Sequence, residues 1–246
     1  CPRALGDPQR LYSMDRVLNP YVRETLEEQR FKLSTWDDAL GLVTRRLRET
    51  LDTNGPESVL LLDYYGNTGL LSSRFSRRLW TALGATRTDG AVCSASGHAA
   101  LGLHYGLSYG VEPEALLDRK IIVFWGFNAK NSSPHTWALA LRARRENDAA
   151  IVVVDPRRSE STSMANLWLY PAPGSDVALC YGLARHLIAG GHVDTGFIAE
   201  RCAGYEAYAE EAMRWTPDRV EAVTGVSHEG VESLGDALVE YGDPVF

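Results

Sequence analysis

The chain has 246 residues, of which 45% are hydrophobic and 23% charged, a composition typical of a folded globular protein. A net charge of −7 excludes the basic surface of a nucleic-acid-binding protein, and no apolar run reaches the roughly 18 residues of a membrane span. The four cysteines are widely spaced and favour neither a disulfide framework nor a zinc site. No signal peptide is recognisable, so a cytoplasmic location is expected.

The first part of the chain predicts two helices around one strand. Residues 1–24 are rich in Arg and turn residues and predict irregular chain. Residues 34–53 carry apolar side chains at helical spacing behind Ser34 or Thr35 as N-cap, and Asn54-Gly55-Pro56 ends this helix. A buried strand is expected over residues 58–67, and a helix over 70–85 that ends at Gly84.

From residue 119 onward, predicted strands alternate with predicted helices. Strands are expected over 119–128, 149–157 and 167–176, helices over 132–147 and 176–191, and several short helices over 194–242. This alternation indicates parallel βαβ units. The expected fold class is therefore α/β, with doubly wound, mostly parallel sheets and flanking helices.

Polar and glycine-rich loops follow the predicted strands over residues 64–69, 125–134 and 154–162, and a fourth loop, 171–179, leads into a helix. In open α/β sheets ligands bind outside the carboxyl ends of the strands. Taken singly, each loop is better explained as a strand-end turn or a helix cap, and it is the occurrence of all four at strand ends of one sheet that favours a ligand site. No GxGxxG or GxxxxGK[ST] motif occurs, which disfavours an ordinary dinucleotide site or P-loop.

Cys93 lies among small residues in "RTDGAVCSASGHAALGLHYG", directly before a predicted helix. A helix N-terminus favours the thiolate, which is a soft metal ligand or a nucleophile. A free cysteine also often only fills space in a core, which is the interpretation for Cys180 and Cys202. A thiol enzyme needs a base, and His98 is off the helical face of Cys93.

The order of several segments resembles the molybdopterin oxidoreductase superfamily, the dimethyl sulfoxide reductase family of bis-molybdopterin guanine dinucleotide enzymes. These segments are "LYSMDRVLNPYVR", "STWDDAL", "YYGNTG", "DGAVCSASGHAA", "IIVFWGFN", "VVVDPR", "PGSDVAL" and "HVDTGFIAERCAGYE". The resemblance implies a molybdenum or tungsten bis-molybdopterin guanine dinucleotide cofactor and a [4Fe-4S] cluster. It implies catalysis of a two-electron oxidation or reduction of a small substrate, as in nitrate reductases or formate dehydrogenases.

The resemblance also implies a role for individual residues. Cys93 corresponds to the catalytic metal ligand, and Cys1 to the last cysteine of an amino-terminal iron–sulfur motif, with Arg3 between cluster and pterin. The remaining implied cofactor contacts are Gly66 and Asn67 at the pterin, Gly126 and Asn128 along the pterin–pyrophosphate, Asp155 and Arg157 at the ribose and guanine, and Gly174 and Asp176 at the guanine edge.

Residues 1–88 are expected to form an amino-terminal α/β segment, and residues 89–246 a truncated cofactor-binding α/β domain. The chain is expected to be part of a larger catalytic subunit that works with an iron–sulfur electron-transfer subunit or domain. Two positions depart from the family: Asn166 follows Ala165 where Asp is usual, and Ser94 follows Cys93 where formate dehydrogenases tend to have His.

Two other functions are open to the sequence. One is a metal-free electron-transfer or scaffold subunit, such as the large iron–sulfur subunit of respiratory NADH dehydrogenases. The other is a thiol enzyme that uses Cys93. The presence of both Cys93 and the nucleotide-type loops argues against the scaffold, and the position of His98 argues against the thiol enzyme.

Overall fold

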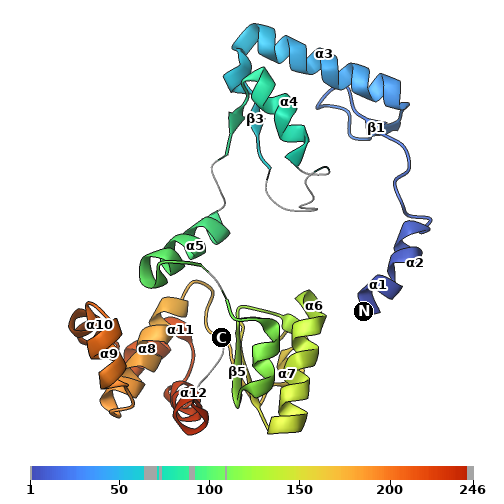
Figure 1. Cartoon of the computed structure of the whole chain (residues 1–246). Coiled ribbons are helices and arrows are strands. Elements are labelled where there is room, and N and C mark those ends of the chain that lie inside the picture. Colours follow the sequence, from blue (N-terminus) through green and yellow to red (C-terminus); the bar gives the residue numbers. More distant parts are fainter. Residues whose placement is uncertain (1, 64–70, 72–73, 89–91, 109, 243–246) are drawn as a thin grey trace. The chain divides into compact units, whose positions relative to one another are not determined.

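The computed structural model describes residues 2–63, 71, 74–88, 92–108 and 110–242. Contacts within the chain divide it into two compact units, Pro2–Gly110 and Val111–Phe246 (Figure 1). The functional boundary expected between residues 88 and 89 stays a prediction. No helix of the described residues is long and apolar enough to cross a membrane.

The first unit is mainly helical, with two small pairs of strands. Strands β1 and β2 are antiparallel, and β3 and β4 are parallel. The residues 1–24 expected to be irregular contain two short helices and β1. The elements are α1 (Pro2–Leu5), α2 (Asp7–Leu11), β1 (Tyr21–Val22), β2 (Lys32–Leu33), α3 (Trp36–Asn54), a 3-10 turn (Pro56–Ser58), β3 (Leu60–Leu61), α4 (Ser76–Leu83), β4 (Thr86–Arg87) and α5 (Val92–Tyr105).

Helix α3 begins and ends where its sequence predicts. The hydroxyl of Thr35 accepts a hydrogen bond from the backbone N–H of Asp38, at 3.2 Å, and so caps the first turn. Gly55 ends the helix with φ +80°, a conformation that favours glycine. Helix α4 ends at Gly84 in the left-handed conformation, as expected, but it begins only at Ser76.

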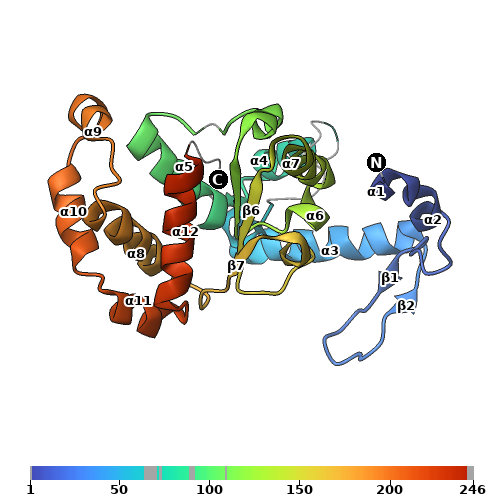
Figure 2. The same ribbon diagram turned by 90° about the horizontal axis from the view of Figure 1, so that it is seen from below.

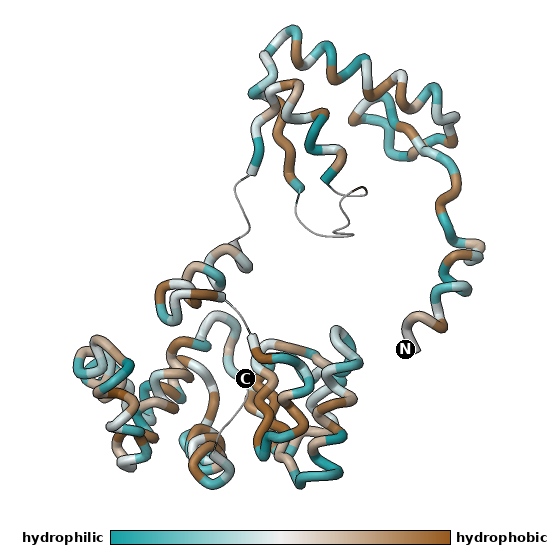
Figure 3. The backbone as a smooth tube through the Cα atoms, viewed as in Figure 1, coloured by the Kyte–Doolittle hydropathy of each residue, from teal (hydrophilic) through white to brown (hydrophobic). Residues whose placement is uncertain are grey.

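The second unit is built on a three-stranded parallel sheet in the order β5-β6-β7. Its strands are β5 (Ile121–Trp125), β6 (Ala150–Val154) and β7 (Leu167–Leu169). Every residue of β6 is buried. A strand covered on both faces has no polar side, which is why "AIVVV" is a continuous apolar run. The tube in Figure 3 shows this hydrophobic concentration at the sheet.

Helices cover both faces of this sheet, so the α/β class with mostly parallel strands and flanking helices is confirmed (Figure 2). Alternate side chains of a strand point to opposite faces. Ile122 and Phe124 pack with Trp137 of α7 (Pro134–Asn147). Ile121 and Val123 pack with Leu179 of α8 (Asp176–Ala189).

The other elements of this unit connect or extend the two helical layers. Helices α8, α11 (Pro217–Thr224) and α12 (His228–Tyr241) pack against one another on one face. The elements are a 3-10 helix (Pro113–Asp118), α6 (Ala129–Ser132), a 3-10 turn (Thr162–Met164), α8 (Asp176–Ala189), α9 (Thr195–Arg201), α10 (Tyr205–Met213), α11 (Pro217–Thr224) and α12 (His228–Tyr241).

Candidate functional site

Backbone hydrogen bonds join the carboxyl ends of the three neighbouring strands β5, β6 and β7. The N–H of Gly126, just after β5, donates to the carbonyl of Val154 at 2.8 Å, and the N–H of Asp155 donates to the carbonyl of Leu169 at 3.0 Å. Gly126 has φ +61°. No described protein atom lies within 4 Å of the place where a Cβ of Gly126 would stand, so the space beside this backbone is open.

Asp176 is the first residue of α8 and lies at the same edge of the sheet. Its Oδ1 accepts a hydrogen bond of 2.8 Å from Nε1 of Trp125, the last residue of β5. Its Oδ2 has no hydrogen-bond donor among the residues that the structure describes, and the side chain is exposed. Gly174, two residues earlier, has φ +83° with open space around it. One carboxylate oxygen is therefore held in place and the other is available to a ligand.

Asn128 links the loop after β5 to the loop after β6. Its Oδ1 accepts from the hydroxyl of Ser161 at 2.8 Å, and its Nδ2 donates to Oε2 of Glu160 at 2.5 Å. Ser161 is fully buried and its hydroxyl also accepts from the N–H of Lys130 at 3.0 Å. Sequence reasoning missed Ser161 and Glu160, although the polar run "RRSEST" behind a buried strand is a signal for them.

Glu160 adds a negative charge to this edge. Its pKa is lowered, first by a hydrogen bond from its own backbone N–H and then by the amide of Asn128. The positive charges of Arg157 and Lys130 lower it further. The edge therefore carries ionised groups of both signs.

Asp155 and Arg157 form a tight turn behind β6. The carboxylate of Asp155 accepts from the backbone N–H of Arg157 at 2.8 Å, and its carbonyl accepts from Nε1 of Trp168 at 2.8 Å. The Asp155 side chain therefore stabilises a turn at Asp155-Pro156, which is the structural role that a strand-end loop can have. Arg157 is exposed, and its guanidinium has no hydrogen-bond acceptor among the described residues, so it is open to a ligand.

Ser159 is the one buried side chain of the described residues whose hydroxyl has no hydrogen-bond partner. The residue is only 4% exposed. Buried polar atoms nearly always find a partner, so an orphaned hydroxyl in a ligand loop fits a partner that the protein does not supply.

For five of the predicted site residues the structure gives no side-chain geometry. Gly66, Asn67 and Cys1 lie outside the described residues. Cys93 is the second residue of α5 and so lies in its first turn rather than ahead of it, and its side chain is not described. The same holds for the side chain of Arg3, a residue of α1.

Other sulfur and imidazole groups have simpler roles. Nδ1 of His98 lies 2.5 Å from the hydroxyl oxygen of Ser108. The poor pairing expected between His98 and Cys93 stays a prediction, because the side chain of Cys93 is outside the described part of the structure. Cys180 and Cys202 are exposed, so the expectation that they fill the core was wrong. Cys180 lies in α8, and Cys202 directly follows α9. The apolar residues next to each cysteine do not show which face of the helix will be buried.

Asn166, one of the two departures from the family, lies at the opposite edge of the sheet. Its Oδ1 accepts from the backbone N–H of Ile151, at 2.9 Å, and from the guanidinium of Arg144. Ile151 is near the start of β6 and Asn166 directly precedes β7. Asn166 in place of the usual Asp therefore affects the contacts between α7, β6 and the start of β7, and it lies away from the candidate site.

A family model described as molybdopterin oxidoreductase matches residues 16–245. The chain belongs to this family. It is 30% identical over 236 residues to a Bacillus subtilis (strain 168) protein named "Probable oxidoreductase YoaE", covering 95% of the chain and 35% of that protein. It is also 30% identical over 200 residues to formate dehydrogenase H of Escherichia coli (strain K12), covering 78% of the chain and 27% of that protein.

A solved structure shares the fold of this molybdopterin oxidoreductase chain. Acetylene hydratase from Pelobacter acetylenicus matches with a TM-score of 0.69 and 24% identity, covering 99% of this chain and 34% of that one. The chain spans about a third of the length of the curated relatives it matches.

Membership of this family implies a molybdopterin cofactor. The carboxyl edge of the β5–β7 sheet fits the polar part of such a cofactor in three respects. The hydroxyl of Ser159 is buried without a partner, Gly126 and Gly174 border open space, and Asp176 keeps an unused carboxylate oxygen.

Proposed function

We propose that the protein is a molybdenum or tungsten oxidoreductase that binds bis-molybdopterin guanine dinucleotide and transfers two electrons to or from a small substrate. The observation that carries the proposal is the gathering of Asp176, Arg157 and the unpartnered Ser159 at one sheet edge, in a chain of the molybdopterin oxidoreductase family. The remainder of the catalytic subunit and an iron–sulfur electron-transfer subunit or domain belong to the same proposal.

Asp176 would bind the guanine edge. A carboxylate oxygen accepts well from the N1–H and amino donors of guanine, and charged acceptors form stronger hydrogen bonds than neutral ones. The bond from Trp125 fixes the other oxygen, so the carboxylate is oriented before the ligand arrives. Orientation in advance lowers the entropy cost of binding.

The other loops would hold the ribose and the phosphates. The guanidinium of Arg157 can pair with phosphate oxygens, and the Ser159 hydroxyl can donate to the same ligand. Gly126 and Gly174 would let the ligand approach the backbone because they lack a Cβ. Asn128 would act mainly by joining the two loops through Ser161 and Glu160.

Cys93 would bind the metal through its thiolate. Its place in the first turn of α5 favours the charged form of a thiol. Small residues follow it in the sequence "CSASGHAA", which leaves room for a large cofactor. Cys1 would ligate a [4Fe-4S] cluster, with Arg3 next to it. When bound, the metal centre supplies the two-electron redox chemistry.

The substrate is not fixed by the relatives, whose names include an oxidoreductase, a formate dehydrogenase and an acetylene hydratase. Ser94 after Cys93 disfavours formate, because the resemblance places His there in formate dehydrogenases. Formate and nitrate are the two substrates to be tested first.

The test is a cofactor analysis of the full-length protein. Molybdenum, tungsten and iron are measured by elemental analysis, and guanosine monophosphate is measured after hydrolysis of the bound cofactor. Activity is followed with a reduced dye and nitrate, and with formate and an oxidised dye. We expect one molybdenum or tungsten and two guanosine monophosphates per protein. A protein with iron but neither guanine nucleotide nor molybdenum or tungsten would instead be the scaffold subunit.

A further inference from the structure

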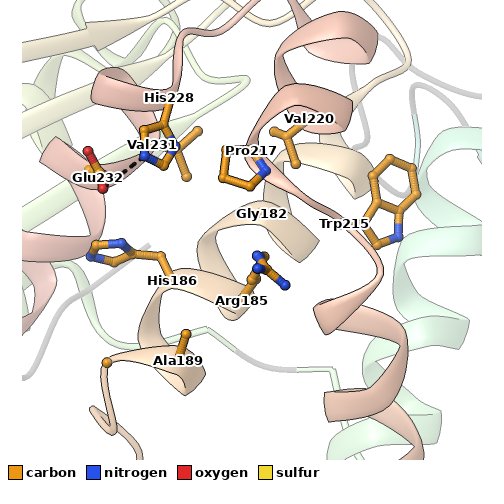
Figure 4. A pocket seen from close by; sticks show the side chains of 11 residues that line it. Gly182, Arg185, His186, Ala189, Trp215, Pro217, Val220, His228, Val231 and Glu232 are labelled. Carbon is orange, nitrogen blue, oxygen red and sulfur yellow. Dashed lines mark ion pairs between the residues drawn. The ribbon is translucent and has the colours of Figure 1, made fainter.

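A cavity of about 290 Å³ lies among helices α8, α11 and α12 (Figure 4). It borders the second half of α8, whereas Asp176 is at the beginning of that helix. The walls are mainly apolar and come from Gly182, Ala189, Pro217, Val220 and Val231. The cavity is therefore separate from the proposed cofactor site.

The walls of the cavity are fixed by close packing. A Cβ on Gly182 would lie 2.8 Å from Cγ2 of the buried Val220, so α8 and α11 are already at contact distance. The ring of Trp215 stacks on Tyr181, with 5.8 Å between centroids and 6° between planes. Arg219 lies over the ring of Trp215, 3.9 Å from its centroid. A ligand would enter a cavity that is already formed.

Arg185 is the cation in this lining with unused donors. Its Nη1 donates to the carbonyl of Met213 at 2.6 Å, which holds the side chain in place. Its Nε and Nη2 have no acceptor among the residues that the structure describes. Figure 4 shows Arg185 between the α12 side chains on one side and Trp215 on the other.

The other ionisable groups of the lining are paired. Nε2 of His228 lies 3.0 Å from Oε1 of Glu232, the pair marked by the dashed line in Figure 4. Nε2 of His186 lies 2.9 Å from Oδ1 of the exposed Asp236. Glu232, the carboxylate in this lining, is paired with His228. Arg185 is therefore free to bind an external anion.

We propose that this cavity binds a small carboxylic acid with an apolar body. The carboxylate would accept from Nε and Nη2 of Arg185, a geometry that favours two parallel hydrogen bonds. The apolar body would lie against Pro217, Val220 and Val231. A volume near 290 Å³ is at the lower end of ligand cavities, which limits the ligand to a small molecule.

The test uses benzoate as probe and uncharged benzamide as its matched control, both titrated by calorimetry into the full-length protein. Benzoate should bind at least tenfold more tightly than benzamide. Arg185→Gln should weaken benzoate binding at least tenfold and leave benzamide unchanged. Arg142→Gln, on α7 and paired with Glu146, should change neither.

A second variant guards against loss of structure in Arg185→Gln, which also removes the bond to Met213. Ala189→Phe leaves Arg185 in place and fills the cavity from the exposed end of α8, so it should abolish binding of both compounds. Circular dichroism spectra show whether each variant is folded. No binding of benzoate to the wild type, or wild-type binding by a folded Ala189→Phe variant, overturns the proposal.

Discussion

Nε1 of Trp125 donates a 2.8 Å hydrogen bond to Oδ1 of Asp176, across 51 positions of the sequence. The bond joins the last residue of β5 to the first residue of α8. It puts the Asp176 carboxylate at the edge where Gly126 follows β5 and Asp155 follows β6. A helix N-terminus also favours a negative charge at this position.

Asp176→Ala should weaken retention of the cofactor. A hydrogen bond to a charged group contributes about 1.5–3 kcal/mol, so the loss corresponds to roughly a tenfold to hundredfold weaker hold. Guanosine monophosphate and metal per protein are measured after prolonged dialysis. Asp218→Ala, an exposed acid in the first turn of α11, is the control and should retain both. Equal retention by the two variants would remove Asp176 from the site.

Cys93→Ala should remove one sulfur from the coordination of the metal. The thiolate is the proposed protein ligand, whereas the pterin sulfurs do not depend on this residue. X-ray absorption spectroscopy of the wild type and the variant measures the number of sulfur ligands. Cys180→Ala serves as control, and an unchanged sulfur count in Cys93→Ala would refute the ligand assignment.

Asn166→Asp should raise the free energy of unfolding by about 0.5 kcal/mol, because the carboxylate would form an ion pair with Arg144 in place of a neutral hydrogen bond. Burial lowers the pKa of Arg144, and a nearby anion opposes that effect. Asn166→Ala should instead lower stability by about 1–2 kcal/mol, since it leaves the N–H of Ile151 unpaired. Urea unfolding measures both. A gain that persists in 1 M salt would not come from the ion pair, because salt at that strength screens exposed charges.

Asp176→Asn should make the thiol of Cys180 reactive at lower pH. Cys180 is an exposed residue, but neighbouring atoms partly desolvate its thiol. This desolvation is the main reason that the pKa of Cys180 is raised, and the negative charge of Asp176 adds to it. Removing that charge favours the thiolate, so the pKa falls. The rate of alkylation by iodoacetamide is followed against pH by peptide mass spectrometry. Cys202 should keep its profile, and an unshifted profile for Cys180 would contradict the electrostatic coupling.

Gly182→Ala should lower the free energy of unfolding by about 1–3 kcal/mol, the usual cost of an added methyl group in a packed core. The new Cβ would meet both Cγ atoms of Val220, which is β-branched and buried and cannot turn away. Gly41→Ala is the matched control, since it lies inside α3 with nothing within 4 Å of its Cβ. That change should stabilise the protein by about 0.5–1 kcal/mol. Equal effects of the two substitutions would show that α8 can move away from α11.

The sequence alone determined strands β5 and β6, the helices α7 and α8, and the edge at which ligands are expected, whereas the strand expected over 167–176 ends at Leu169. The runs "IIVFW" and "AIVVV" are buried strands because they are apolar throughout, and the polar loops behind them mark the carboxyl ends. Thr35 and Gly55 define α3 through local hydrogen bonding and backbone conformation. All of these signals lie within a few residues of the feature that they predict.

Only the tertiary structure decided which side chains meet. Asn128 reaches Ser161 across 33 positions, and Trp125 reaches Asp176 across 51, because the parallel strands bring their carboxyl ends together. The cavity at Arg185 depends on the packing of three helices, and the outward position of Cys180 depends on the face that α8 buries. Composition and periodicity specify elements one at a time. Hydrogen bonds and cavities between elements follow from their packing, which no short stretch of sequence contains.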